Sequence, residues 1–466
     1  MLNIKSVSMR YFPVMTTSPR PLLRRPLKPD AGPDRGSGTR IKPGWAASSD
    51  TRPLRIALLG YRSNPYCGGQ GIYLSYLSKA LLELGHSVDV ISGEPYPDLS
   101  PGVKLIPLPG LNLYSYSKPT KGLKDRGLHS WTDILEYMSF ITGGFPEPLT
   151  FTRRLAHSFR KQAPAYDIVH DNQSLGSGLL SLQNQKQAVV ATIHHPITRD
   201  LRLALANEPQ WGMRLFIRRW HAFLAMQKRV AQQMDRIISV SRQAKMDLVH
   251  DFQLPASGID VVLNGVDTHI FAPRPEVPRI PNRIMATASA DVPLKGLIHL
   301  LQAIVSLKSE IPDIQLRVLG RPKTDGPTAR LLQQADLHEH VCFVHGLSTE
   351  ELVREYAASS LAVVPSLYEG FGLPAAEAMA CAVPVVATDA GGLPEVVGNA
   401  GCIVPPGDSQ ALAAVIRSLL AQPETLNSLG QAGRRRMLNQ FTWKRAAEET
   451  EAVYRRVLKK KGRGRE

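Results

Sequence analysis

The segment SLYEGFGLPAAEAMA, residues 366–380, places two carboxylates around a glycine-rich turn. Glu369 and Glu377 are eight positions apart, and the run GFGLP lies between them. A proline is favoured at the first position of a helix, so the sequence predicts a strand over 361–366 and a helix from Pro374. The free N–H groups at a helix start attract anions, and carboxylates accept hydrogen bonds from hydroxyls. We therefore expect a loop that holds a phosphate through its backbone and two polyol groups through the two glutamates.

A plainer reading exists for each residue of this segment. Glu377 could only complement the helix dipole, and Glu369 could be an ordinary surface residue. Gly370 and Gly372 are predicted to let the backbone approach a phosphate, because glycine has no Cβ. The combination of both glutamates, both glycines and the proline at a strand-to-helix junction favours the ligand site.

Length and composition describe a soluble chain with room for two domains. The 466 residues exceed what one hydrophobic core normally organises. No apolar run reaches about 18 residues, so no membrane-spanning helix is expected, and the N-terminus lacks the apolar core of a signal peptide. The cysteines Cys67, Cys342, Cys381 and Cys402 are scattered. We expect neither a disulfide framework nor a metal site, and a cytoplasmic location.

The formal charge of +16 is concentrated at the two ends of the chain. Residues 1–52 contribute +7 and residues 455–466 contribute +6, which leaves only +3 for the body. A nucleic-acid-binding protein would need a basic body, so we expect no nucleic-acid partner. Basic tails can bind anionic lipid or polyanions, or they can simply be solvated.

Alternating strand and helix patterns predict two doubly wound α/β domains. The first half has strand-like runs at 54–60, 86–92, 165–171, 188–194, 236–241 and 258–265. Proline, glycine and aromatic residues interrupt the alternation over 95–160, which is predicted to be a loop-rich excursion. The expected organisation is a disordered basic tail (1–52), an N-terminal Rossmann-like domain (53–270), a proline-rich linker (271–283), a C-terminal Rossmann-like domain (284–445), and a terminal helix that crosses back, with a basic tail (446–466).

Several segments together resemble the GT-B-fold glycosyltransferases of family 4, also called glycosyl transferases group 1. The stretch PSLYEGFGLPAAEAMACAVPVVATDAGGLPEVV (365–397) is similar to the family's E-x7-E region, and CGGQGIYLSYLSKALLELGHSVDVI (67–91) to its glycine loop and first helix. Further similar segments follow in the family's order: DIVHDNQ (167–173), ATIHHP (191–196), IISVSRQAKMDL (237–248), VVLNGVDTHIF (261–271) and LKGLIHLLQAI (294–304).

This resemblance covers about residues 54–445 and implies a fold and a reaction. The fold would be two Rossmann-like domains facing a central cleft, with the acceptor on the N-terminal side and the donor on the C-terminal side. The donor would be a nucleotide-diphosphate sugar, and the sugar would be transferred with retained anomeric configuration. No metal and no other cofactor would be needed. The acceptor would be a glycan or a lipid-linked saccharide.

The resemblance also implies a role for each matched residue. Glu377 would hold the donor ribose, and Glu369 would contact hydroxyls of the transferred sugar. Lys295 would neutralise the diphosphate, and His194 would lie near the acceptor and the reacting carbon. The remaining donor contacts would come from Gly69, Gly370, Phe371, Gly372 and Leu373. Plainer readings remain for Lys295 as a solvated lysine and for His194 and His195 as ordinary histidines.

The chain departs from the family pattern at two positions. The family usually has an arginine where Ala290 stands, so a bidentate phosphate partner is missing unless Arg283 or Arg321 replaces it. The family also favours glycine where Ala382 stands.

Two other functions remain open at this point. The alanine at position 290 leaves room for a non-catalytic nucleotide-sugar-binding relative. A dehydrogenase is a further alternative, but Leu74 occupies the third glycine position of a G-x-G-x-x-G fingerprint.

The stretch MRLFIRRWHAFLAMQKRVAQQM, residues 213–234, predicts an amphipathic helix with a basic face. Arginines and lysines alternate there with Phe216, Trp220 and Phe223. Such a helix could lie on an anionic membrane and admit a lipid-linked acceptor, or it could pack on the domain with a solvated basic face. Peripheral contact with the inner face of the membrane is therefore one expectation.

Overall fold

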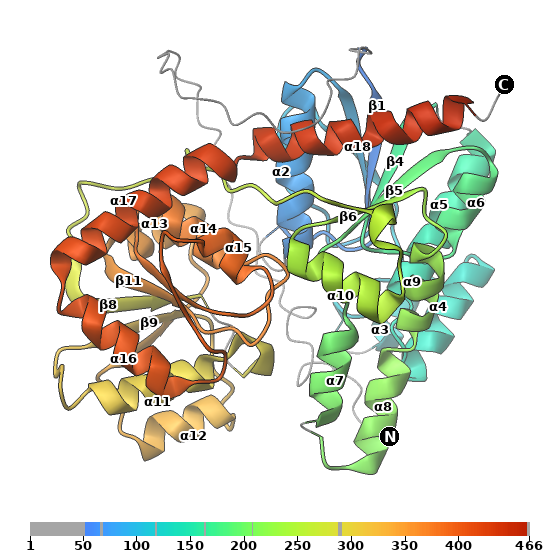
Figure 1. Cartoon of the computed structure of the whole chain (residues 1–466). Coiled ribbons are helices and arrows are strands. Elements are labelled where there is room, and N and C mark those ends of the chain that lie inside the picture. Colours follow the sequence, from blue (N-terminus) through green and yellow to red (C-terminus); the bar gives the residue numbers. More distant parts are fainter. Residues whose placement is uncertain are drawn as a thin grey trace.

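The structure is a computed structural model that describes residues 52–65, 69–116, 119–162, 165–206, 208–287 and 291–463. Nearly all of the predicted N-terminal tail, Cys67, Gly68 and Ala290 lie outside these residues. Two α/β halves lie side by side; α17 (Pro423–Gln440) lies on the second half, and α18 (Trp443–Arg463) continues from it across the first (Figure 1). The predicted α/β class with two doubly wound domains is confirmed.

The first half is built on a seven-stranded parallel sheet with the strand order β3-β2-β1-β4-β5-β6-β7. Its strands are β1 (Arg55–Gly60), β2 (Ser87–Ser92), β3 (Lys104–Pro107), β4 (Ile168–Asn172), β5 (Ala188–Ile193), β6 (Arg236–Ser239) and β7 (Ile259–Val261). Its helices are α2 (Gly69–Glu83), α3 (Pro119–Arg126), α4 (Trp131–Ile141), α5 (Glu147–Gln162), α6 (Gly178–Asn184), α7 (Thr198–Ala206), α8 (Trp211–Trp220), α9 (Phe223–Ala231), α10 (Arg242–Phe252) and the 3-10 turn η2 (Ala256–Gly258).

The second half is built on a six-stranded parallel sheet with the order β10-β9-β8-β11-β12-β13. Its strands are β8 (Ile280–Ala286), β9 (Gln315–Leu319), β10 (Val341–Val344), β11 (Ser359–Val364), β12 (Val385–Thr388) and β13 (Cys402–Val404). Its helical elements are η3 (Pro293–Lys295), α11 (Leu297–Leu307), α12 (Pro327–Gln334), α13 (Thr349–Ala357), α14 (Leu373–Ala380), α15 (Leu393–Val397), α16 (Ser409–Leu420) and α17 (Pro423–Gln440).

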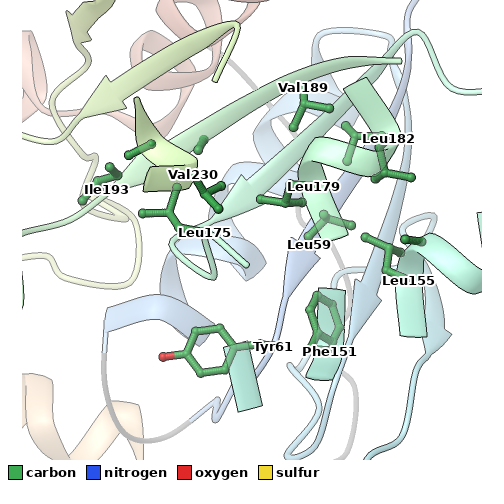
Figure 2. Close-up of a cluster of buried hydrophobic side chains, with 14 of the residues drawn as sticks. Leu59, Tyr61, Phe151, Leu155, Leu175, Leu179, Leu182, Val189, Ile193 and Val230 are labelled. Carbon is green, nitrogen blue, oxygen red and sulfur yellow. The ribbon is translucent and has the colours of Figure 1, made fainter. Parts of the chain in front are cut away.

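Helices cover both faces of each sheet. Because successive strand residues point to opposite faces, neighbouring residues of one strand join different cores. In β1, Ala57 and Leu59 join a core that includes Phe151 and Leu155 of α5 (Figure 2). Their neighbours Ile56 and Leu58 join a different core with helix α2. Strands buried on both faces need near-continuous apolar runs, which explains why the pattern of these strands was readable in the sequence.

The strand order reverses at one place in each sheet, between β1 and β4 and between β8 and β11. Ligands of open α/β sheets bind beyond the carboxyl ends of the strands at such reversals. The loops that follow β1, β4, β8 and β11 are therefore the expected position of a site in each half.

The last helix, α18 (Trp443–Arg463), returns to the first half and packs against α2 (Figure 1). Its Tyr454 is fully buried, and the hydroxyl is hydrogen-bonded to His170 of β4. The indole of Trp443 stacks on Tyr76 of α2. A helix that begins at the second half thus contributes to the core of the first.

The prediction of a loop-rich excursion over 95–160 was wrong, because the segment contains β3, α3, α4 and most of α5. Most of its glycines and prolines occupy the connections, such as Gly143 before α5, or the first turn of a helix, such as Pro148. Breaker residues at element ends are compatible with regular structure between them.

The predicted linker 271–283 also ends too late, since β8 begins at Ile280. Pro281 is tolerated there because the ladder between β8 and β9 starts only at Arg283. A proline removes an N–H, and before the ladder begins that donor is not needed.

Candidate functional site

Lys295 and Glu369 form an ion pair at the strand reversal of the second sheet. Lys295 ends η3 beyond β8, Glu369 lies in the loop after β11, and Lys295 Nζ donates to Glu369 Oε1 over 2.6 Å. The hydroxyl of Ser366 donates to the same oxygen over 2.9 Å. Both ion-pair partners keep some solvent exposure, at 32% and 13% of their side chains. A ligand can therefore reach a mobile cation and a carboxylate together.

The two turns that carry this pair fit closely because of a glycine. Gly296 has φ +63°, and a Cβ there would lie 1.9 Å from the carbonyl oxygen of Pro365. Only glycine adopts this conformation readily and leaves that space. The Lys-Gly step is thus a requirement of the packing that brings η3 against the loop after β11.

Glu377 lies in the first turns of α14 in a different environment. Its carboxylate accepts a hydrogen bond from the hydroxyl of Tyr356 over 3.3 Å. Burial raises the pKa of Glu377 to about 7, and the hydrogen bond from Tyr356 only partly opposes this. The carboxyl therefore changes its charge near neutral pH. A ligand whose hydroxyls donate to it would favour the charged form.

His194 follows β5 on the opposite side of the site. Its Nε2 donates to Asn172 Oδ1 over 2.7 Å, so Nδ1 is left as the acceptor. Its backbone N–H donates to Gln173 Oε1, and its ring meets the edge of Tyr73 at 4.8 Å. Loss of solvation lowers the pKa of His194 to about 3, with further lowering from neighbouring histidines. His194 is thus a neutral imidazole.

The two halves touch through Gly370. A Cβ on Gly370 would lie 2.3 Å from the carbonyl oxygen of His194, and the hydroxyl of Ser241 donates to the carbonyl of Gly370 over 2.7 Å. Gly69 is also close to the second half, since its Cβ would lie 3.9 Å from Leu373. The structure therefore brings His194, Gly69 and the loop bearing Glu369 to a common place.

Glycine at positions 370 and 372 has a packing reason that the sequence did not reveal. The space beside Gly370 is filled by His194, and a Cβ on Gly372, which has φ +104°, would meet Leu393 at 2.5 Å. Phe371, between them, is 5% exposed and packs into the core that includes α14. These three residues shape the turn through contacts with protein atoms.

His195 lies next to Gly370 at the contact between the two halves, and no role was predicted for it from the sequence. Its Nε2 lies 3.3 Å from Asp200 Oδ2. Desolvation alone would lower the pKa of His195, but the hydrogen bond to Asp200 and the charges of Asp200 and Glu369 outweigh it and raise the pKa. The two adjacent histidines therefore differ in charge behaviour. The only sequence signal for His195 was its position directly after His194 in ATIHHP.

Tyr368 forms another missed contact between the halves. Its hydroxyl donates to Asp247 of α10 over 2.7 Å, and the guanidinium of Arg199 lies 4.4 Å from the centre of its ring. Arg199 in turn pairs with Asp247 at 2.6 Å. This small network holds the loop after β11 against α7 and α10.

The two arginines considered as replacements at position 290 lie in different places. Arg283 is directed to Gln315, the first residue of β9, which is the amino end of the sheet. It is therefore at the wrong edge to meet a ligand at the strand reversal. Arg321 follows the carboxyl end of β9 and is hydrogen-bonded to His345. Of these two, only Arg321 lies at the edge that carries Lys295.

The alanine at position 382 has a visible conformational cost. Ala382 adopts φ +55°, which lies in the left-handed region. This explains why glycine would be favoured there, since a Cβ makes that conformation less stable by roughly 1–2 kcal/mol.

Comparison with known proteins identifies the family. The model for "Glycosyl transferases group 1" matches residues 275–436, and the model for "Glycosyltransferase Family 4" matches residues 67–270. The chain belongs to this glycosyltransferase family. It is an enzyme of the GT-B fold, as the sequence predicted, and membership removes the dehydrogenase alternative.

Individual relatives agree with this membership. The MMP α-(1→4)-mannosyltransferase of Mycolicibacterium hassiacum is 44% identical over 87% of this chain and 98% of the relative. The D-inositol 3-phosphate glycosyltransferase of Segniliparus rotundus is 28% identical over 87% of this chain and 90% of the relative. Sucrose-phosphate synthase from Thermosynechococcus elongatus superposes with a TM-score of 0.66 at 26% identity, over 86% of this chain and 98% of that chain.

In the described part of the chain, none of the helices is both long and apolar enough to cross a bilayer. In the same residues, no three side chains of the His, Cys, Asp or Glu type gather as a metal ion would require.

Proposed function

We propose that this glycosyltransferase moves a hexose, specifically mannose, from a nucleotide-diphosphate sugar to a saccharide or lipid-linked acceptor. The similarity to an α-(1→4)-mannosyltransferase at 44% identity supports the choice of sugar. The observation that carries the proposal is the convergence of Lys295, Glu369 and the start of α14, with His194 facing them from the other half. A cation, the positive amino end of a helix dipole and hydroxyl acceptors together suit an activated sugar.

The proposed transfer retains the anomeric configuration. The bond between the anomeric carbon and the diphosphate oxygen breaks, and its electron pair leaves with the diphosphate. The acceptor oxygen forms the new bond on the same face, and its proton goes to the departing phosphate oxygen. Negative charge therefore grows on the diphosphate while the sugar becomes oxocarbenium-like, and fixed positive charge at the leaving group lowers the barrier.

The residues have distinct parts in this proposal. Lys295 and the positive amino end of α14 stabilise the leaving diphosphate, so the proposed mechanism requires no resident metal or other cofactor. Glu369, positioned by Lys295 and Ser366, accepts hydrogen bonds from the sugar. Glu377 accepts them from the ribose. His194, as a neutral imidazole whose orientation is fixed by Asn172, positions the hydroxyls near the reacting carbon.

Closing of the two halves would exclude water and protect the donor from hydrolysis. The contacts of Gly370 with His194 and of Tyr368 with Asp247 are those that a closed state would strengthen. We propose a cytoplasmic location, with peripheral contact at the inner face of the membrane.

A donor panel tests the proposal. Thermal unfolding is measured with UDP, GDP and ADP and with their glucose and mannose conjugates, and the best donor is then offered to saccharide acceptors. We expect one nucleotide series to raise Tm and its mannose conjugate to be turned over. Proton NMR of the product then gives the anomeric configuration. Stabilisation without either transfer or hydrolysis would overturn the proposed donor, and inversion would overturn the retaining mechanism.

A further inference from the structure

Helix α4 carries a row of exposed apolar side chains. Trp131 is 81% exposed, and Ile134, Met138 and Ile141 are 37%, 50% and 40% exposed. Their spacing of three or four residues places them on one face of the helix. Large apolar residues scattered singly on a surface are ordinary, but a continuous row of them usually marks an interaction site.

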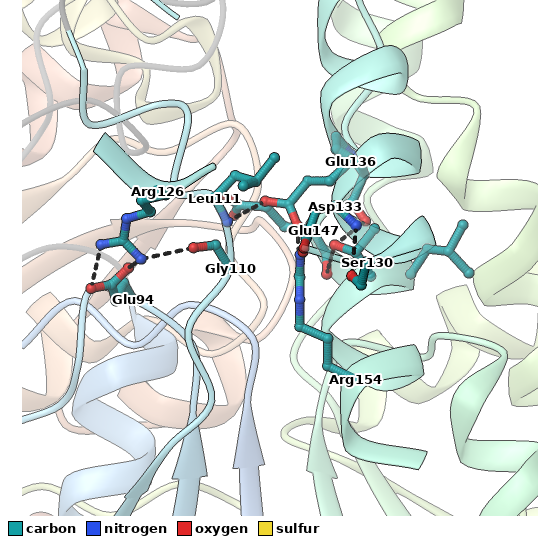
Figure 3. Close-up of polar contacts among 12 residues, drawn as sticks. Glu94, Gly110, Leu111, Arg126, Ser130, Asp133, Glu136, Glu147 and Arg154 are labelled. Carbon is teal, nitrogen blue, oxygen red and sulfur yellow. Dashed lines mark hydrogen bonds and ion pairs between the residues drawn. The ribbon is translucent and has the colours of Figure 1, made fainter. Parts of the chain in front are cut away.

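The opposite face of α4 is fixed to the domain. Asp133 and Glu136 each pair with Arg154 of α5 at 2.6 Å, and Phe140 is buried (Figure 3). Glu136 also accepts a hydrogen bond from the backbone N–H of Leu111. Because these contacts fix the rotation of α4, its apolar row cannot turn inward.

Helix α8 has the same two-sided character. Trp211 is 78% exposed and Leu215 is 54% exposed, whereas Ile217 and Trp220 are fully buried on the other side. The predicted single helix over 213–234 is in fact two helices, α8 and α9, because the chain turns at His221. Its Trp220 therefore belongs to the core, which corrects the expectation that this side chain could meet a membrane.

The two exposed faces belong to neighbouring helices. Arg219 of α8 donates to Thr142, the residue after α4, over 2.8 Å, and a Cβ on Gly143 would lie 2.6 Å from the ring of Phe216. We define the α4–α8 surface as Trp131, Ile134, Met138, Ile141, Trp211 and Leu215. These are six of the eleven large hydrophobic residues that are exposed in the described part of the chain.

The charge around this surface decides between occupants. Residues 211–231 contain five arginines and lysines and no acidic residue, and the two acidic residues of α4, Asp133 and Glu136, are both paired with Arg154. Among them, Arg218, Arg219 and Arg229 are exposed. Two copies of the chain joined through this face would bring like charges together, whereas an anionic lipid surface would be attracted to it. Exposed tryptophans with adjacent basic residues are typical of segments that lie in the headgroup region.

We propose that the α4–α8 surface docks on an anionic lipid bilayer, with Trp131 and Trp211 inserted at headgroup level. Helix α7 leads from the end of β5 towards α8 and contacts η3, which bears Lys295. Helix α8 of this surface is therefore connected through α7 to the loop after β5, which carries His194. This inference gives the proposed membrane contact a location, but it does not depend on glycosyl transfer.

Vesicle sedimentation of the full chain tests this docking without donor or acceptor. Vesicles of phosphatidylcholine alone are compared with equimolar phosphatidylcholine and phosphatidylglycerol, at low and at high salt. We expect binding to the anionic vesicles only, weakened at high salt, and a blue shift of tryptophan emission. The double variant Trp131→Ser/Trp211→Ser should bind at least about tenfold more weakly, and Arg218→Glu severalfold more weakly.

Matched controls separate this effect from general changes. Met246→Ala and Arg435→Glu alter an exposed apolar and an exposed basic residue on α10 and α17, away from the α4–α8 surface, and should leave binding unchanged. Circular dichroism checks that each variant is folded. The proposal is overturned if the full chain does not bind anionic vesicles, or if the tryptophan variant binds as well as the parent chain.

Two further measurements distinguish membrane docking from self-association of the chain and from glycosyl transfer. If the tryptophan variant changes the oligomeric state in analytical ultracentrifugation while vesicles never bind, a second copy of the chain is the occupant and the proposal is wrong. The donor panel is run on the same variants. A variant that loses vesicle binding but still turns over donor shows that docking and transfer are separate properties.

Discussion

The two sides of the candidate site supply different kinds of groups. The second half provides ionisable groups from the turns around β11 and α14: Lys295 is paired to Glu369, and burial raises the pKa of Glu377 to about 7. The groups of the first half nearest to Gly370 include the neutral imidazole of His194 and the amide of Asn172, and the ionisable pair of His195 and Asp200 lies beside them. The difference fits the proposal that the second half binds the charged donor and that His194 orients hydroxyls.

Removing the cation should have the largest effect. Lys295→Ala deletes the ammonium that pairs with Glu369, and we expect turnover to fall by about 100- to 1000-fold, as for other preorganised charge donors. Acceptor KM should change much less. Lys79→Ala, which removes an exposed lysine paired with Glu83 on α2, is the matched control. An unchanged kcat in the Lys295 variant would remove this residue from the mechanism.

Glu377→Gln should change the pH dependence of donor affinity, because it removes the ionisable carboxyl at this position. Because the pKa is raised to about 7, donor affinity of the parent chain should increase between pH 6 and pH 8 as the carboxylate forms. The glutamine variant should bind donor roughly 10- to 100-fold more weakly at pH 8 and lose that pH dependence. Isothermal calorimetry across this range provides the measurement.

The same variant should be more stable at high pH. A carboxyl with a raised pKa stabilises the fold fully below its unfolded value, near pH 4.5, and this contribution is lost as pH rises through about 7. At pH 8, Glu377→Gln should therefore increase the free energy of unfolding by roughly 1–3 kcal/mol. Equal stability of both chains at pH 4.5 and pH 8 would show that burial does not act on this carboxyl.

Gly370→Ala tests whether the two sides must meet closely. The new methyl group would lie 2.3 Å from the carbonyl oxygen of His194, and because both groups are fixed to backbone the halves must separate. We expect kcat to fall by about tenfold with both sheets intact by circular dichroism. Gly212→Ala adds a methyl group into open space on α8 and is the control. Full activity in the Gly370 variant would show that the observed contact is not needed for turnover.

The smallest effect is expected on the first side, at His195. Asp200→Asn removes the partner that raises its pKa, so the NMR titration of His195 should move to lower pH while His194 stays neutral. The raised pKa stabilises the fold below the unfolded value near 6.5 and this contribution is lost as pH rises through the folded value. The variant should therefore lose at most about 1 kcal/mol, and only on the acidic side. An unmoved titration would mean that Asp200 does not set the charge of His195.

Sequence patterns correctly predicted the helices and strands that depend mainly on residues close together in the chain. The strand, glycine turn and helix over 361–380 were predicted correctly, because a buried strand needs an apolar run and the turn that follows it needs glycine and proline. The same reasoning predicted every strand of the second sheet, every strand of the first sheet except β3, and the two-domain α/β class. It failed over 95–160, where long-range contacts such as Glu136 with Arg154 hold α4 and α5 in place. The hydrophobic periodicity of the sequence does not indicate such contacts.

The amino-acid types and their order therefore determined the family, the fold and the identity of the candidate residues. Only the tertiary structure decided their states. Lys295 and Glu369, which are 74 positions apart, form an ion pair. The pKa of Glu377 is raised, and the pKa values of the adjacent His194 and His195 are shifted in opposite directions. The reason is that charge state depends on solvation and on neighbours brought together by folding, and neither is encoded at the position itself.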